Sequence, residues 1–155
     1  MMDGVAEQLT QEAPTPAPKL AYLIKRIEMV QRARMEEALR PLGVVLNQYT
    51  ALSLLERRQL SSAQLARRHY VTPQAMNQLV ATMERDGLIE RHPDPHNRRV
   101  LRAALTDRGT EVLASCHAAV EDLENQVLAA LTPVEAEQFR RSLGRALTAL
   151  TEMST

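Results

Sequence analysis

Apolar residues recur at intervals of three and four positions through most of this 155-residue chain, a spacing that predicts helices. The pattern begins at Lys19 and runs to Arg40, roughly 30 Å as an α-helix, before Pro41 and Gly43 interrupt it. Three more stretches repeat it: residues 47–58, residues 106–131, which Thr106 caps, and residues 132 onward, which open on a Thr-Pro capping box. The part between residues 60 and 105 follows another pattern.

The outer predicted helices carry more apolar surface than one chain of this size can cover. In residues 106–131 a narrow seam alternates spacings of three and four, as in a coiled coil, at Leu113, Cys116, Val120, Leu123 and Val127. The last helix bears a stripe of Phe139, Leu143, Leu147 and Leu150. We therefore expect a homodimer in which the first and last helices of two chains interleave.

The stretch Leu60–Leu105 predicts two short helices and a two-stranded ribbon, to which Leu60 can add a one-residue bridge. A capping box at Ser61-Ser62-Ala63-Gln64 begins the first short helix, which lasts about two turns. Thr72-Pro73 is typical of a second helix start, and Gly87 suits the left-handed conformation that ends a helix. Two such helices joined by about three residues form a helix-turn-helix, whose second helix enters the DNA major groove.

The second of these helices has two chemically different faces. One face is apolar, with Met76, Leu79, Val80 and Met83. The other carries amides, a hydroxyl and a guanidinium, which are the groups that read base edges: Gln74, Asn77, Gln78, Thr82 and Arg85, with Ala81 among them. The alternative is an ordinary solvated face, but such faces are more often rich in Glu and Lys.

The ribbon is expected at Leu88–His92 and Arg99–Leu105, joined by a turn at residues 93–98 that contains two prolines. His96, Arg98 and Arg99 lie at or beside the tip of this hairpin. A short cationic hairpin beside a recognition helix is a wing, suited to contact with the DNA backbone or minor groove; the alternative is a solvated hairpin. We expect Asp94 to hold an arginine or a turn amide, because a free carboxylate there would repel phosphate.

Composition and charge refine this interpretation. With 45% hydrophobic residues but one Phe, three Tyr and no Trp, the core must be aliphatic, which favours an α-rich fold. The net charge is zero, but residues 56–102 contain nine arginines and five acids, so this segment is +4 and the rest of the chain is −4. Local positive charge matters for DNA because phosphate attraction is local. A solvated surface could carry the same charges.

Several classes of protein are disfavoured. No apolar run approaches the roughly 18 residues of a membrane span, no signal peptide is evident, and the single Cys allows no internal disulfide, so we expect a cytoplasmic protein. The histidines lack metal-ligand spacing and no catalytic motif is present, so we expect no metal, cofactor or enzymatic activity. Residues 1–18, with three prolines, are interpreted as a mobile tail. A helical winged-helix module that binds protein instead of DNA is the alternative function.

The order of helix-turn-helix, the wing sequence GLIERHPDPHNRRV and the helix start LTDRG resembles the MarR family of bacterial winged-helix regulators. The resemblance implies a mainly α fold of six helices and a small hairpin wing. Residues 46–106 would form the DNA-binding lobe, and residues 19–45 and 107–155 the dimerisation helices. It also implies binding to pseudo-palindromic promoter DNA, often as a repressor that a phenolic or lipophilic anionic effector releases.

The resemblance also implies roles for individual residues. Positions used for bases in the family fall on Gln74, Asn77, Gln78 and Thr82, and positions that contact phosphate fall on Ser62 and Thr72. The family's Asp-x-Arg-Asp-x-Arg wing pattern is altered here, because His96 replaces the tip Arg and Asn97 the second Asp. A contact made by His96 would depend on pH, and Asn97 can still bond Arg99, without charge assistance.

Family ligands lie between the dimerisation helices and the DNA lobe, which makes Tyr22, Arg26, Met29 and Tyr49 the candidate effector residues. The alternative is that these side chains simply pack at an amphipathic boundary. Some relatives sense oxidants through a cysteine near the N-terminus. Cys116 lies instead on the seam of a late helix, so we expect it to be buried, although a disulfide between two chains is an alternative if the seam pairs with itself.

Overall fold

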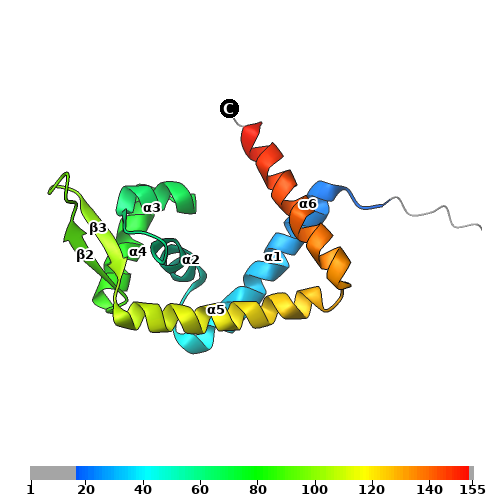
Figure 1. Cartoon of the computed structure of the whole chain (residues 1–155), viewed down its shortest axis with the longest axis horizontal. Helices are drawn as coiled ribbons and strands as arrows, with labels where there is room; N and C mark the ends of the chain where they lie inside the picture. The colour runs from blue at the N-terminus through cyan, green and yellow to red at the C-terminus, as the bar shows by residue number, and fades with distance from the viewer. Residues whose placement is uncertain (1–16, 154–155) are drawn as a thin grey trace, which may run out of the picture.

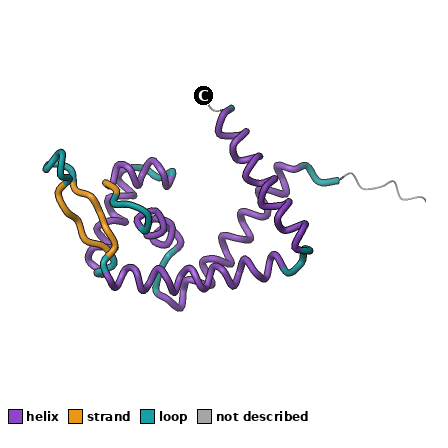
Figure 2. Tube along the Cα trace, in the orientation of Figure 1, coloured by secondary structure: helices purple, strands orange, loops and turns teal. Residues whose placement is uncertain are grey.

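The computed structural model describes residues 17–153, so most of the predicted tail lies outside the described residues. The described chain is mainly α-helical (Figures 1 and 2). Its elements, in order, are α1 (Leu20–Leu39), the 3-10 helix η1 (Arg40–Leu42), α2 (Leu46–Leu55), β1 (Leu60–Ser61), α3 (Ser62–His69), α4 (Pro73–Arg85), β2 (Ile89–Pro93), β3 (Leu101–Leu105), α5 (Asp107–Leu128) and α6 (Pro133–Glu152).

The molecule consists of a lobe and an extension. In Figure 1 the lobe holds α2, α3, α4 and the strands, while α5 runs from the base of β3 to the far end of the molecule. The C-terminal end of α1 packs against the middle of α5, and at the far end of α5 the chain turns back into α6. Figure 1 shows α6 projecting from the end of α5, and residues of α1, α5 and α6 line one common groove. The expected six helices and hairpin wing are confirmed.

Three predicted boundaries were wrong by a few residues. α2 ends at Leu55 and not at residue 58, because the chain must turn to bring Leu60 into the sheet. α5 ends at Leu128 and not at residue 131, because tight i to i−3 hydrogen bonds at residues 130 and 131 turn the chain before Thr132. The second wing strand begins at Leu101 and not at residue 99, since the turn closes through a bond between Asp94 N–H and the Val100 carbonyl (2.8 Å).

The sheet is antiparallel, in the order β1-β3-β2. β2 pairs with β3 along its whole length, from Ile89 opposite Leu105 to Pro93 opposite Leu101. The bridge expected at Leu60 is a two-residue strand, with Leu60 opposite Ala103. Both of these residues are buried, so β1 attaches the start of the helix-turn-helix to the base of the wing.

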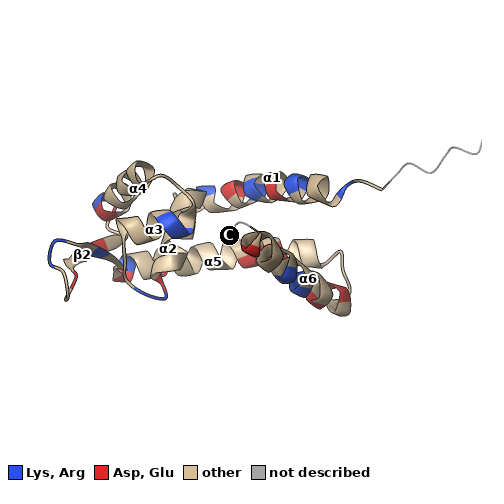
Figure 3. Cartoon of the chain, turned by 90° about the horizontal axis from the view of Figure 1, so that it is seen from above, with Lys and Arg blue, Asp and Glu red and all other residues tan. Residues whose placement is uncertain are grey.

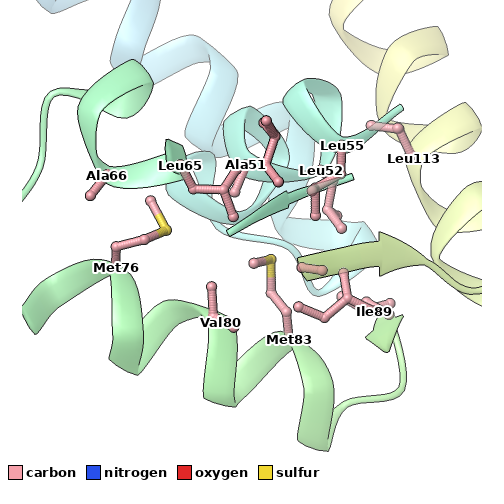
Figure 4. Close-up of a cluster of buried hydrophobic side chains, with 13 residues drawn as sticks. Ala51, Leu52, Leu55, Leu65, Ala66, Met76, Val80, Met83, Ile89 and Leu113 are labelled. Atoms are coloured by element: carbon pink, nitrogen blue, oxygen red, sulfur yellow. The ribbon is translucent and has the colours of Figure 1, made fainter. Parts of the chain in front are cut away.

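The core of the lobe lies under the recognition helix (Figure 4). Met76, Val80 and Met83 point from α4 into a cluster to which α2, α3, the sheet and α5 all contribute. All three side chains are buried and Leu79 is partly buried, which confirms the predicted apolar face. One cluster therefore sets how α4 lies against the rest of the lobe.

A second, smaller cluster joins the lobe to the extension. Leu39 at the end of α1, Val44 in the following loop and Cys116 of α5 are buried together. Cys116 is fully buried, as expected, and burial raises the pKa of its thiol. Beyond this cluster the seam of α5 becomes progressively exposed, and Val127 is 55% exposed.

Gly109 is required by the junction between α5 and the wing. A Cβ built at this position would lie 1.9 Å from the carbonyl oxygen of Leu88, which is backbone and cannot move aside. Leu88 is itself anchored, because its carbonyl accepts the Thr106 N–H (3.2 Å). The first turn of α5 can therefore approach the base of β2 only without a side chain at residue 109.

We expect Gly109→Ala to lower the free energy of unfolding by about 2 kcal/mol or more, as overpacking of a close backbone contact does. Gly144→Ala is the matched control, because a Cβ on this α6 glycine meets nothing within 4 Å. Alanine's higher helix propensity should there stabilise the protein by up to about 1 kcal/mol. Urea unfolding followed by circular dichroism measures both, and equal effects of the two substitutions would contradict the assigned role of Gly109.

Candidate nucleic-acid interface

The second helix of the helix-turn-helix begins as its sequence predicts. The Thr72 hydroxyl oxygen accepts the Ala75 N–H (3.2 Å), and Pro73 occupies the first turn, where a missing N–H leaves no bond unmade. Because Met76, Val80 and Met83 bury one face of α4, the other face points into solvent. Gln74, Asn77 and Gln78 are exposed there, and Thr82 is half-buried.

The first helix of the motif, α3, packs against α4 and has the predicted capping box. Ser61 accepts the Gln64 N–H (3.3 Å), and the Gln64 side chain accepts the Ser61 N–H (3.0 Å). Ser62 is the first helical residue and is half-buried, so the N-terminus of α3 remains partly accessible to solvent. Arg67 and Arg68 in the last turn are exposed.

Asp94 organises the tip of the wing. Its side chain is buried and accepts the N–H groups of His96 (2.7 Å) and Asn97 (3.2 Å), and it pairs with the guanidinium of Arg102. The His96 N–H, with help from Arg102 and the Asn97 N–H, holds the pKa of this carboxyl below its usual range. The expected structural role of Asp94 is confirmed.

The same turn points its cations outward. The Asn97 side-chain oxygen accepts the backbone N–H of Arg99 (3.2 Å), so the bond between these residues reaches the main chain and leaves the guanidinium free. His96, Arg98 and Arg99 are all exposed. The wing therefore has a folded turn that presents three basic side chains.

Ion pairs divide the nine arginines of residues 56–102 into two groups. Arg85, Arg91 and Arg102 pair with Asp86, Glu84 and Asp94, respectively. The Glu84–Arg91 pair links α4 to β2, and Arg91 holds the pKa of Glu84 below its usual range. No ion pair is made, within this fully described segment, by the other six: Arg57, Arg58, Arg67, Arg68, Arg98 and Arg99. The net positive charge is thus concentrated before β1, at the end of α3 and on the wing, whereas α1 mixes both signs (Figure 3).

Comparisons with known proteins agree with this geometry. The MarR family profile matches residues 42–100. The HTH-type transcriptional repressor Rv2887 of Mycobacterium tuberculosis is 38% identical over 136 residues, which cover 87% of this chain and 94% of the relative. This chain belongs to the MarR family.

Solved MarR family structures extend the comparison. Rv2887 of M. tuberculosis in complex with DNA has a TM-score of 0.73 at 35% identity and covers 83% of this chain and 98% of its own. Rv2887 in complex with salicylic acid has a TM-score of 0.71 at 36% identity, with coverage of 84% and 98%. Apo MarR of Escherichia coli shares the fold, with a TM-score of 0.75 at 23% identity and coverage of 84% and 98%.

The four candidate effector residues fall into two groups in this MarR family protein. Tyr22, Arg26 and Met29 share one face of α1, where the Arg26 guanidinium lies 5.8 Å from the centre of the Tyr22 ring. Tyr49 packs beside Leu39 at the other end of α1, which is roughly 25 Å from Tyr22 along a helix. Within one protomer the structure does not bring Tyr49 beside the other three.

Tyr49 lies in a network that sequence reasoning missed. Its hydroxyl is 3.1 Å from Nδ1 of His117, and the other ring nitrogen of His117 is 3.3 Å from a carboxylate oxygen of Glu56. Burial raises the pKa of the Tyr49 phenol. The network ties α2 to α5, and no local motif could have shown it, because His117 is 68 residues from Tyr49.

Two negative findings apply to the described residues. None of their helices is long and apolar enough to cross a membrane. Over residues 17–153, no group of three or more His, Cys, Asp or Glu side chains is arranged to hold a metal ion.

Proposed function

We propose that this protein is a transcriptional regulator that binds duplex DNA in a sequence-specific manner, acting as a cytoplasmic repressor on a pseudo-palindromic promoter site. The observation that carries the proposal is the exposed Gln74, Asn77 and Gln78 face of α4, held outward by the buried Met76, Val80 and Met83. One relative supports it, since Rv2887 is named a repressor and has been solved with DNA.

The proposed contacts divide by chemistry. Gln74, Asn77, Gln78 and Thr82 contact base edges, because amides and hydroxyls match the donor and acceptor pattern of the major groove. Ser62 and Thr72, at the starts of α3 and α4, contact phosphate through hydroxyl and main-chain groups. His96, Arg98 and Arg99 contact the backbone or minor groove from the wing.

A protein-interaction module is the alternative, and the charge distribution disfavours it. Protein interfaces concentrate aromatic and apolar residues in their centres. The exposed face of α4 instead carries amides, and the unpaired cations lie on α3 and the wing on either side of it. That arrangement suits duplex DNA, which is a polyanion whose base edges offer hydrogen-bond donors and acceptors.

Asn77→Ala and Gln78→Ala test base readout. Each should weaken binding to the cognate site by about 1–3 kcal/mol, because one amide contact to a base is lost, and should leave binding to unrelated DNA nearly unchanged. The protein's own promoter region provides the first site to try, in a gel shift or fluorescence anisotropy titration. Gln59→Ala, an exposed amide in the loop before β1, is the control. The proposal fails if the wild-type protein does not distinguish its own upstream region from unrelated duplexes.

We propose that the functional unit is a homodimer built from residues 19–45 and 107–155, with residues 46–106 as the DNA-binding lobe. The supporting observation is apolar surface that one protomer leaves uncovered. α6 has no buried residue, and Leu147 and Leu150 are 68% and 57% exposed. In the first half of α1, Leu20 is 69% exposed. A cavity of about 540 Å³ lies between α1, α5 and α6, and its lining includes Ile27, Val127 and Leu143. Soluble monomers rarely expose such continuous apolar surface.

Leu147→Glu should break this dimer. An unpaired charge placed in an apolar interface should weaken association by at least about 3 kcal/mol, and the loss should appear as a monomer in sedimentation or light scattering. DNA affinity should fall with it, because one winged helix meets only one half-site. Gln138→Glu places the same charge elsewhere on α6 and should remain dimeric. A wild-type protein that is monomeric at micromolar concentration would contradict the proposal.

We propose that a small aromatic acid releases the DNA. Structures of Rv2887 with salicylic acid and with p-aminosalicylic acid support this for a relative. In this chain two candidate subsites remain, Tyr49 with its His117 network and the Tyr22, Arg26 and Met29 face of α1.

Salicylate titrated into a protein–DNA complex should release the DNA and raise the melting temperature of the free protein. Tyr49→Phe and Arg26→Gln assign the subsite, because the substitution in the occupied subsite should raise the salicylate concentration required. If salicylate and related aromatic acids cause neither release nor a melting shift, the effector proposal is wrong, while DNA binding is unaffected.

A further inference from the structure

The turn of the helix-turn-helix contains a tyrosine in an unusual backbone conformation. Tyr70 follows α3 with φ 56° and ψ 36°, and it is the one described non-glycine residue with a positive φ. Its N–H bonds the Ala66 carbonyl, which closes α3. The left-handed region is occupied readily by Gly and tolerated by Asn, but it is strained for a bulky side chain.

The side chain of Tyr70 makes no stabilising contact within the described part of the protomer. It is 93% exposed, and its phenol makes no hydrogen bond or ring contact with the described residues. A strained backbone carrying an unused aromatic side chain suggests that the side chain acts on something outside the protomer.

The position of Tyr70 indicates what that is. It lies two residues before Thr72, the N-cap of α4, and two residues after Arg68, which is exposed on α3 together with Arg67. A helix about 10–12 Å across fills a major groove about 12 Å wide. The chain that leads into the N-terminus of an inserted helix therefore passes the phosphates at the rim of the groove.

We propose that Tyr70 is a DNA-backbone contact, in which the phenol O–H donates to a phosphate oxygen beside the major groove and the ring packs against the adjoining sugar. This inference rests on the proposed function, because it requires α4 to enter the groove. Such a contact positions the protein without reading sequence. It also accounts for a bulky residue at a backbone position that Gly or Asn would occupy without strain.

Two variants separate this role from a structural one. Tyr70→Phe removes only the hydroxyl, and Tyr70→Asn removes the ring while suiting the left-handed backbone. We expect both to weaken binding about tenfold or more, equally on the cognate site and on unrelated duplex, since the bond to a charged group is lost. Tyr70→Asn should also raise the melting temperature of the free protein. Gln59→Ala should leave both properties unchanged.

Salt dependence distinguishes the phenol from an arginine. A neutral side chain releases no counterion, so the dependence of log K on log salt should keep its slope in Tyr70→Phe. Arg98→Ala should instead reduce that slope by about one per lost contact.

The measurements distinguish failure of the Tyr70 contact from failure of the proposed DNA-binding function. If wild-type protein binds its site and Asn77→Ala weakens binding, but both Tyr70 variants bind like wild type, only this inference is overturned. A lower melting temperature in Tyr70→Asn would also overturn it, because the side chain would then stabilise the protomer itself. If wild-type protein shows no sequence preference, the proposed function fails first.

Discussion

The burial of one face of α4 is the constraint on which the rest of the lobe depends. Met76, Val80 and Met83 are covered by α2, α3, the sheet and α5, so the helix cannot rotate without exposing apolar surface. Each fully buried side chain of this kind contributes about 1.5–3 kcal/mol. The face of α4 that carries Asn77 and Gln78 points into solvent because the opposite face is buried in the core. The polar surface proposed for base readout is thus positioned by the hydrophobic effect.

Charged side chains in the same lobe have two roles: some form ion pairs that hold its elements together, and others make its surface positive. Glu84 and Asp94 hold Arg91 and Arg102, and these pairs fasten the wing to α4 and fold its tip. Because those acids are used internally, they leave the exposed arginines of α3 and the wing without local compensation. A chain with no net charge can in this way present a basic surface to a polyanion, because the compensating negative charge lies in the rest of the chain.

α5 connects the lobe to the apolar surface that one protomer leaves open. One face of its first half is buried against the lobe and the end of α1, and the apolar seam of its second half is left partly or largely exposed. The Tyr49–His117–Glu56 network clamps α2 to the middle of this helix. The network therefore helps to fix the orientation of the lobe on α5.

Local physics explains which features the sequence by itself determined. Capping boxes, Pro at a first turn, Gly87 after α4 and spacings of three and four depend on neighbours within a few residues. They placed the six helices, the wing, the apolar face of α4 and its polar opposite. Only the tertiary structure decided features that join distant segments: the end of α2, the need for Gly109 and the clamp at His117. It also decided which arginines are neutralised, how far Tyr49 lies from Tyr22, and the left-handed backbone of Tyr70. Each of these follows from how packed elements meet in space, and a pattern of neighbouring residues carries no information about that.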